Sequence, residues 1–490
     1  MMKYATIHAD DAAIPGLIAV IEERRGWWSR LGTDLFLCVA NDGWPGLARA
    51  LQDAGHVLGV QGSVRQGALW LVVQKGRAFQ REHPRARVLL DKGRYLVAEL
   101  TKAQAERMAA RGEGCFQVMA LPRNAAVFQT HAPRRARAMP PAAPALVAGV
   151  QDEVFRQAIT HLVSYRTRHS TSADYAQAAA WAQAQFQALG LAARTVPITV
   201  GGGTSANVIA TKPGLGPDAG QVLVVGHLDS VNHPGGPDAP APGADDNASG
   251  SAGVLTLAAA AAAHDFAHDL TFILFGGEEQ GLHGSTQYVA GLEGEARARI
   301  RAVLNMDMIG SVNAQPPAVL LEGAALSQPL IDRLAEAAGA FTDLDVQVSL
   351  QPFGSDHMPF LDAGIPAVLT IEGTDGANDA IHTANDLLDR IDMGYALQIL
   401  RMNAGWLAQE AGLAEPALPR PDAPAAGCGN AGPAAFDQAV LAAQNQLAGH
   451  YQALLAQYAR LDRDGLLAPG DLVERQSLWA LCDHLRSDCG

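Results

Sequence analysis

The chain has 490 residues, of which 48% are hydrophobic and 18% are charged, a composition typical of a folded protein with more than one domain. Its formal net charge of −14 argues against a nucleic-acid or anionic-membrane partner, because both bind basic surfaces. No apolar run is long enough for a membrane span, and no signal peptide is visible at the N-terminus. We expect either a cytoplasmic protein or a mature form that has lost its signal, and the sequence leaves the oligomeric state open.

Two stretches rich in proline and alanine, at residues 133–144 and 416–426, have the composition of exposed linkers. They divide the chain into three predicted regions: an N-terminal region at 1–145, a central region at 146–415 and a C-terminal region at 416–490. The first of these stretches contains several arginines, so it is also a candidate processing site.

Short β-rich runs alternate with helical runs in the N-terminal region. The predicted strands cover 35–39, 68–73, 94–100 and 115–121, and the predicted helices cover 45–54 and 102–111. This pattern predicts a small α+β domain, and we find no catalytic or metal-binding motif in it.

The central region begins with two helical patterns, after which apolar runs alternate with helical runs. The helices are predicted at 154–163, 175–189, 249–263, 327–338 and 388–411, and the strands at 222–225, 270–275, 302–306, 319–321 and 367–371. Continuous apolar strands separated by helices are typical of a sheet that is buried on both faces, so we predict an α/β fold with a mixed, mostly parallel sheet between helices. The C-terminal region predicts a helical hairpin at 434–461 and 469–486.

Carboxylates and histidines follow the predicted strands of the central region. His227 follows the first strand, and Asp229 comes two residues later, where its carboxylate can accept the second ring N–H of a metal-bound histidine. Two glycines after the next strand precede Glu278 and Glu279, and Asp307 follows the third strand. Because ligands bind beside the carboxyl ends of strands in open α/β sheets, we expect these side chains to converge.

Two loops add further candidates. The segment PGADDNASG places Asp245 and Asp246 before a predicted helix, and His382 and Asp386 precede the last one. Each group also has an ordinary structural explanation, such as a helix cap for the aspartates or a charged first turn for the glutamates. Together, nitrogen and oxygen ligands without cysteine favour catalytic zinc over structural zinc, and five ligands suit two metal ions that share a carboxylate.

The cysteines give no sign of a metal site of their own. None of the five forms a CxxC or a Cys/His pair at zinc spacing, so we expect no cysteine-bound metal. Three of them, Cys428, Cys482 and Cys489, crowd into the tail, which suits either one disulfide or three free thiols.

The motifs HLDS, PGADDNASG, GGEEQGLHGS, NMDMIG, SDHMPF and IHTANDLL occur in this order, and residues from about 152 to 412 resemble the M28 family of zinc peptidases, whose bacterial members include the leucyl aminopeptidases. The resemblance implies the zinc-peptidase fold, two Zn²⁺ ions and a peptide substrate. It also favours a secreted or periplasmic protein.

The resemblance implies a ligand set. Asp246 would bridge the two zinc ions. His227 and Asp307 would complete one site, and Glu279 and His382 would complete the other.

The resemblance further implies an aminopeptidase mechanism. Glu278 matches the general base, and Asp229 matches the partner of the zinc-bound His227. A metal-bridging hydroxide would form as Glu278 takes its proton, attack the scissile carbonyl, and leave Glu278 to protonate the departing amine. The sequence departs from the family at one point. Some relatives carry a tyrosine that stabilises the oxyanion, but the matching positions here are residues 352–354 (Pro-Phe-Gly) and Ile381.

Several alternatives stay open. A carboxypeptidase or dipeptidase of the same family would usually need an arginine or lysine near the site, and none stands beside these motifs. Glutaminyl cyclase shares the fold with a single zinc, but its loops differ from GADDNASG and EEQGLHGS, and a non-catalytic binding protein should have lost a ligand. The N-terminal region is either a propeptide that covers the active site and is cut near 134–137, or a permanent accessory domain.

Overall fold

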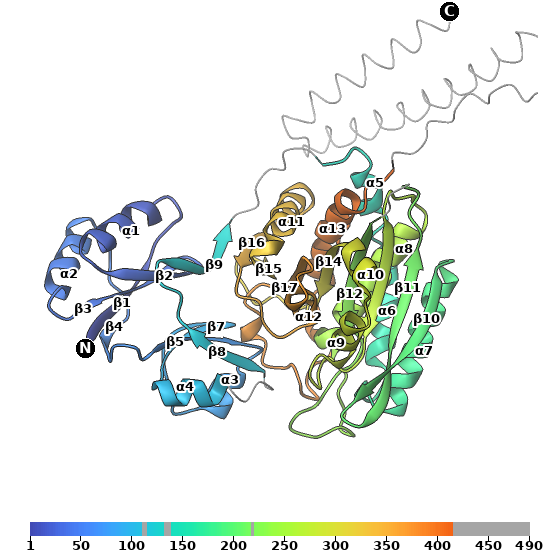
Figure 1. Cartoon of the computed structure of the whole chain (residues 1–490), viewed down its shortest axis with the longest axis horizontal. Coiled ribbons are helices and arrows are strands. Elements are labelled where there is room, and N and C mark those ends of the chain that lie inside the picture. Colours follow the sequence, from blue (N-terminus) through green and yellow to red (C-terminus); the bar gives the residue numbers. More distant parts are fainter. Residues whose placement is uncertain (110–114, 132–138, 217–219, 415–490) are drawn as a thin grey trace, which may run out of the picture. The chain divides into compact units, whose positions relative to one another are not determined.

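The computed structural model describes residues 1–109, 115–131, 139–216 and 220–414 (Figure 1). By their contacts, Met1–Pro416 form one compact unit, which contains all of the described residues. The predicted C-terminal hairpin, the three tail cysteines and the predicted cleavage segment lie outside the described residues. None of the described helices combines the length and the hydropathy needed to cross a bilayer.

Most of the described strands join one large mixed sheet, and the rest form a smaller one. The strands are β1 (Met2–His8), β2 (Trp27–Leu31), β3 (Asp34–Ala40), β4 (Gln61–Val64), β5 (Leu69–Gln74), β6 (Arg87–Lys92), β7 (Tyr95–Glu99), β8 (Phe116–Ala120), β9 (Ala125–His131), β10 (Ala192–Val200), β11 (Gly203–Lys212), β12 (Gln221–His227), β13 (Asp269–Phe275), β14 (Ile300–Met306), β15 (Ala318–Gly323), β16 (Asp345–Ser349) and β17 (Ala367–Glu372). The large sheet has the order β10-β11-β13-β12-β14-β17-β15-β16-β9-β2-β3-β1-β4, and the small sheet has the order β6-β7-β5-β8.

The helices connect these strands along the chain. They are α1 (Ile14–Glu23), α2 (Trp44–Asp53), α3 (Ala78–Glu82), α4 (Lys102–Ala109), α5 (Ala143–Ala148), α6 (Asp152–Val163), α7 (Ala173–Ala188), α8 (Gly250–Ala262), α9 (His283–Ala290), α10 (Gly294–Arg299), α11 (Gln328–Phe341), α12 (His357–Asp362) and α13 (Met393–Glu410). Four short helical turns complete the set: η1 (Ala244–Ser249), η2 (Ala325–Ser327), η3 (Asp375–Ala377) and η4 (Leu388–Arg390).

The centre of the large sheet is parallel and buried on both faces. Strands β13, β12, β14 and β17 lie side by side and run in the same direction. On β12, Val222 and Val224 pack into a core shared with helices α5 to α8, α11 and α13, while Leu223 and Val225 pack into a second core with α9 and α12. This arrangement explains the unbroken apolar runs that the sequence shows at these strands, since neither face meets water.

The predicted α/β fold is confirmed, with the five predicted central strands found as β12, β13, β14, β15 and β17. One predicted boundary is wrong. The helix expected at 388–411 begins at Met393, because the Asp392 side chain accepts a hydrogen bond from the Tyr395 N–H and caps the helix there. The preceding residues form η4 instead. Strands β10, β11 and β16 were not predicted, since polar residues interrupt their apolar pattern.

The N-terminal region contributes strands to both sheets. Strand β9 pairs with β2 on one side and with β16 of the central region on the other. The small sheet packs Leu71 and Val97 into a core that also contains Leu320 and Ile371 of the central region. The two predicted regions therefore share backbone pairing and a hydrophobic core, and the predicted boundary at residue 145 stays a prediction.

Candidate metal centre

The candidate ligands lie at the carboxyl ends of neighbouring parallel strands. His227 ends β12, Asp307 follows β14 directly, and Glu278 and Glu279 follow β13. Between β13 and the two glutamates the chain turns at Gly277, whose φ of +69° strongly favours glycine. The sheet thus brings together side chains that lie up to 80 residues apart in the sequence.

Asp229 fastens the turn after β13 to the end of β12. Its carboxylate accepts the backbone N–H of Glu278 at 3.3 Å and that of Glu279 at 3.2 Å. The Nδ1 atom of His227 lies 3.2 Å from the backbone oxygen of Asp229 and 3.6 Å from its carboxylate. The nearer partner of His227 is thus the backbone oxygen of Asp229, while the Asp229 carboxylate positions the two glutamates.

A first group of candidate ligands surrounds His227. Its Nε2 atom lies 3.3 Å from Asp307 Oδ1 and 4.0 Å from Glu278 Oε2, and all three residues are buried. Their ligand atoms lie within 4.8 Å of one another, which is a spacing that one metal ion can span.

A second group surrounds His382. Its Nε2 atom lies 3.0 Å from Asp246 Oδ2 and 3.0 Å from Glu279 Oε2. The other carboxylate oxygen of Asp246 lies 3.2 Å from His227 Nε2, so Asp246 stands between the two groups. His382 holds a positive φ of +57°, a backbone conformation that is costly for a non-glycine residue and recurs at functional sites.

The donor set fits metal ions better than it fits hydrogen bonding. Within the described part of the chain, both carboxylate oxygens of Asp246, one of Glu279 and the Nε2 atom of His382 are buried without a hydrogen-bond partner. Buried polar atoms are costly when they are left unpaired. Metal ions bound between the two groups would satisfy these atoms together.

Asp386 holds the Asp246 loop in place. Its two carboxylate oxygens accept the backbone N–H groups of Asp245 and Asp246, each at 2.9 Å. The alternative reading of the two aspartates as caps of the following helix is wrong, because α8 begins only at Gly250 and its first N–H donates to the side chain of Asn247. Asp246 instead has a non-helical backbone and points its carboxylate at the two histidines.

Burial and neighbouring charges shift the pKa values of the carboxylates at the centre in opposite directions. Burial opposes the ionisation of Asp246, but His227 and His382 outweigh it and hold the pKa of this carboxyl well below its usual range. Burial, together with the nearby charges of Glu279 and Asp307, raises the pKa of Glu278 well above its usual value. A carboxyl that readily holds a proton beside ionised ligands is suited to acid–base work.

A lysine of the N-terminal region also reaches the centre. Lys75, directly after β5, places its Nζ atom 3.0 Å from Glu278 Oε1 and 3.3 Å from Asp307 Oδ2. No lysine or arginine stands beside the motifs in the sequence, but the fold brings Lys75 to the site. The sequence could not reveal it, because 203 residues separate Lys75 from Glu278.

A cysteine of the N-terminal region lies beside His382. The Sγ atom of Cys115 is 3.6 Å from His382 Nδ1 and 3.6 Å from His233 Nε2. Burial opposes ionisation of the thiol, but the two histidines outweigh it and lower its pKa to about 6. Sequence spacing gave no sign of this group, since 118 residues separate Cys115 from His233.

The positions at which some relatives carry tyrosine serve packing here. The backbone oxygen of Phe353 accepts a hydrogen bond from Arg94, and the buried Ile381 side chain belongs to the core shared with the small sheet. Neither residue carries a side-chain donor, so any oxyanion donor has to come from another residue.

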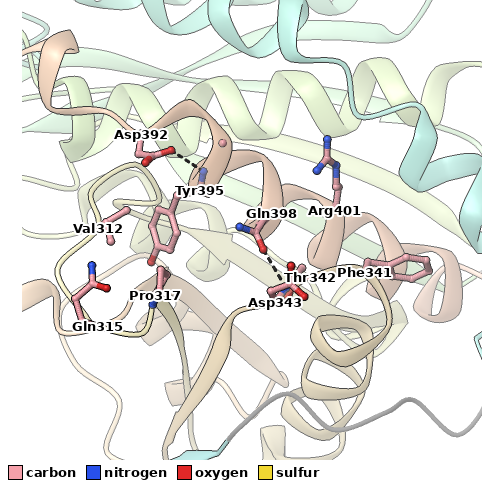
Figure 2. A pocket seen from close by; sticks show the side chains of 11 residues that line it. Val312, Gln315, Pro317, Phe341, Thr342, Asp343, Asp392, Tyr395, Gln398 and Arg401 are labelled. Carbon is pink, nitrogen blue, oxygen red and sulfur yellow. Dashed lines mark hydrogen bonds between the residues drawn. The ribbon is translucent and has the colours of Figure 1, made fainter. Parts of the chain in front are cut away.

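The described surface also has a pocket of about 750 Å³ that none of the candidate ligands lines. Figure 2 shows its wall, where Asp392 accepts from the Tyr395 N–H and Gln398 accepts from the Asp343 N–H. The pocket lies along α13, and its lining contains no group of metal ligands. We therefore place the chemistry at the strand ends.

Comparison with solved structures supports the fold. The LapA aminopeptidase of Legionella pneumophila superimposes with a TM-score of 0.51 and 18% identity, over 70% of this chain and 98% of that one. LapB from the same organism gives a TM-score of 0.50 at 18% identity. At this identity the likeness concerns the fold alone.

Curated relatives match the central region. Leupeptin-inactivating enzyme 1 of Streptomyces exfoliatus is 34% identical over 214 residues, which are 43% of this chain and 44% of that enzyme. The chain thus spans less than half the length of that relative. A probable leucine aminopeptidase of Trichophyton verrucosum is 26% identical over 277 residues, which are 54% of this chain and 72% of the relative.

The family model described as Peptidase family M28 matches residues 207–407. This segment contains both groups of candidate ligands, from His227 to His382. In this segment the chain is similar to the members of peptidase family M28.

Proposed function

We propose that the protein is a zinc-dependent aminopeptidase that binds two Zn²⁺ ions. The observation that carries the proposal is the place of Asp246, whose two carboxylate oxygens lie 3.2 Å from His227 Nε2 and 3.0 Å from His382 Nε2. A carboxylate shared between two histidine-containing groups is the arrangement that a two-metal hydrolase requires.

We assign the ligands by this geometry. Asp246 would bridge the two ions, His227 and Asp307 would hold one of them, and Glu279 and His382 would hold the other. All five side chains are acidic or imidazole groups, which suits zinc at a catalytic centre. When bound, the two ions lower the pKa of a water molecule and polarise the scissile carbonyl.

We assign the proton transfers to Glu278. Its side chain is 4% exposed, and one of its carboxylate oxygens faces the His227 group at 4.0 Å. In this place it takes the proton of the attacking water and delivers it to the leaving amine. Asp229, which binds the backbone N–H groups of Glu278 and Glu279, keeps both carboxylates in position.

The centre contains four carboxylates. Asp246, Glu278 and Asp307 are buried and Glu279 is partly buried, so a carboxylate that is not bound to a metal ion could bind the N-terminal amine of a substrate. The name of one relative, probable leucine aminopeptidase, suggests peptides with an N-terminal leucine as the first substrates to test.

The test is hydrolysis of aminoacyl p-nitroanilides, with leucyl p-nitroanilide as the first substrate. We expect a chelator to abolish the reaction and Zn²⁺ to restore it, with two zinc ions per chain measured by atomic spectroscopy. The matched control is N-acetyl-leucyl p-nitroanilide, which lacks the free ammonium. Equal hydrolysis of the acetylated compound would refute the aminopeptidase assignment.

The alternative of a carboxypeptidase or dipeptidase gains one cation from the structure, since Lys75 lies at the centre. Its ammonium binds two carboxylates, which leaves one N–H donor for a substrate carboxylate. Release of C-terminal residues from N-acetylated peptides would favour this alternative. Cyclisation of N-terminal glutamine would favour a glutaminyl cyclase.

A further inference from the structure

A cysteine and two histidines meet beside the candidate metal centre. The Sγ atom of Cys115 lies 3.6 Å from Nε2 of His233 and 3.6 Å from Nδ1 of His382. The three ligand atoms lie within 4.8 Å of one another, which is the same limit that the two groups of proposed zinc ligands meet. This group uses Nδ1 of His382, whereas the carboxylates of Asp246 and Glu279 lie at Nε2.

The two sulfur–nitrogen distances are those of a tetrahedral zinc site. Zinc binds a cysteine sulfur at about 2.3 Å and a histidine nitrogen at about 2.0–2.1 Å, which places the two ligand atoms about 3.5–3.6 Å apart at the tetrahedral angle. Both distances from Cys115 Sγ have this value. A thiol, in contrast, is only a weak hydrogen-bond donor and acceptor, so hydrogen bonding gives little reason for two imidazoles to converge on one sulfur atom.

Backbone contacts hold the three residues in place. Cys115 directly precedes β8, and its backbone oxygen accepts the N–H of Lys75 at 2.8 Å. The backbone N–H of His233 donates to the backbone oxygen of His382 at 3.1 Å, and the two imidazole rings meet edge to face with their centres 4.6 Å apart. The ligand atoms are therefore positioned by the fold, which lowers the entropic cost of binding an ion.

The group is open to solvent and leaves one ligand position free. His233 is exposed and Cys115 is partly buried, so the opening lies on the side of His233. Three protein ligands leave the fourth position of a tetrahedral ion to water, unlike a purely structural zinc site, which the protein fills completely. A thiolate beside two imidazoles favours Zn²⁺ and other thiophilic ions such as Cd²⁺ over Mg²⁺ and Ca²⁺, which prefer oxygen ligands.

We propose that Cys115, His233 and Nδ1 of His382 form a third metal site, which binds Zn²⁺ with a water molecule as the fourth ligand. On binding, the ion displaces the proton of the Cys115 thiol and the Nδ1 proton of His382, and both are released to solvent. His382 then joins this ion to the proposed catalytic centre through its two ring nitrogens. The sequence predicted no cysteine-bound metal, because 118 and 267 residues separate Cys115 from the two histidines.

The first test is titration of the zinc-loaded, reduced full-length chain with Cd²⁺, a probe whose thiolate complexes absorb in the ultraviolet. The parent for this test carries Cys428→Ser, Cys482→Ser and Cys489→Ser, so that only Cys115 and the fully buried Cys38 can give this absorption. We expect sulfur-to-metal absorption from one Cd²⁺ ion per chain. It should vanish in Cys115→Ser, and the proposed zinc ligands cannot produce it because none of them contains sulfur.

His233 distinguishes a three-ligand site from a lone reactive thiol. In His233→Ala we expect Cd²⁺ to bind at least about 10–100-fold more weakly, since the loss of even an outer partner of a metal ligand typically costs this much. The matched control is His264→Ala, at a histidine outside all three groups of candidate ligands, which should keep the parent affinity. His233→Asn, with the same expected loss, is the second variant should the alanine variant fail to fold. Absence of the absorption from the parent would overturn the inference, and so would parent affinity in His233→Ala.

The second test counts zinc directly. The chain is dialysed against a series of buffered concentrations of free Zn²⁺, and its metal content is measured by atomic spectroscopy. We expect the parent to retain one zinc ion more than Cys115→Ser, whatever number the ligands at the strand ends hold. Equal zinc content in the two chains across the series would overturn the inference.

The two tests separate this site from the proposed function, with which it shares His382. If no variant hydrolyses any aminoacyl p-nitroanilide but the sulfur-to-metal absorption requires both Cys115 and His233, the aminopeptidase function fails and the third site stands. If the enzyme is active and the absorption is absent, the third site fails and the function stands.

Discussion

The N-terminal and central regions bring opposite charges to the same place. The central region supplies carboxylates at its strand ends, with Glu278 and Asp307 at the metal centre and Glu322 and Asp375 beside it. The N-terminal region supplies two buried cations, Lys75 and Arg94, and each binds two of these acids. Each of the two cations is paired, which matters because a buried charge without a partner is costly.

The comparison shows that two carboxylates of the candidate metal centre also bind the ammonium of Lys75. Carboxylates that lie close together repel one another, and a positive side chain relieves that repulsion. In this chain the cation at Asp307 comes from a region that lies outside the family segment at 207–407. The predictions that follow separate what each region contributes.

The largest effect is expected from Glu278→Ala, which removes the proposed base from the central region. Turnover should fall by roughly 10²–10⁴-fold, the usual contribution of general acid–base catalysis, while both metal ions remain bound. The measurement is kcat together with zinc content. Glu295→Ala, at an exposed glutamate of the same region, is the control, and retained turnover in Glu278→Ala would remove this residue from the role.

The next largest effect is expected on zinc content, and it distinguishes Asp246, the proposed bridging ligand, from ligands that would bind one ion only. Asp246→Asn weakens a contact shared by both groups, so we expect zinc content to fall at both sites, whereas His382→Ala should lose one ion only. Zinc per chain, measured after dialysis, checks this. Asp332→Asn, at an exposed aspartate, should keep the parent content. Equal losses in Asp246→Asn and His382→Ala would contradict the bridging role.

A smaller effect concerns the contact between the regions. Arg94→Met leaves Glu322 and Asp375 buried without their cation, which should cost about 3–5 kcal/mol of unfolding free energy. Burial already raises the pKa of Asp375 to about 6, even with Arg94 in place. The folded variant will therefore take up protons as the pH falls, and the loss of stability should be smaller at mildly acidic than at mildly alkaline pH.

Denaturant unfolding at both pH values checks the prediction for Arg94→Met. A change below about 1 kcal/mol would mean that the guanidinium does not stabilise the two acids in the folded protein.

The smallest effect is expected on the unfolding free energy, from a lysine of the N-terminal region that is exposed rather than buried. Lys102 forms an exposed i,i+4 pair with Glu106, in contrast to the buried pairs of Lys75. Lys102→Met should change the unfolding free energy by less than about 0.5 kcal/mol, because exposed ion pairs contribute little. A larger change in thermal or denaturant unfolding would show that surface charge matters more in this region than burial suggests.

Local sequence patterns were sufficient to predict many of the strands and candidate ligands of the central region. Apolar runs predicted β12, β13 and β14, and the polar residues at their ends predicted where His227 and Asp307 would lie. This worked because parallel strands are read from continuous apolar segments and their carboxyl ends meet at one edge. The prediction failed at edge strands such as β10, whose alternating polar residues resemble a loop.

By itself, the sequence determined the fold class, a resemblance to peptidase family M28 and a set of candidate ligands, because each depends on residues that are close together in the chain or follow a strand directly. The tertiary structure alone decided that Lys75 and Cys115 lie at the metal centre and that Asp386 holds Asp246. These contacts join residues more than 100 positions apart. No local pattern encodes them, since they arise only when separate strands and loops pack together.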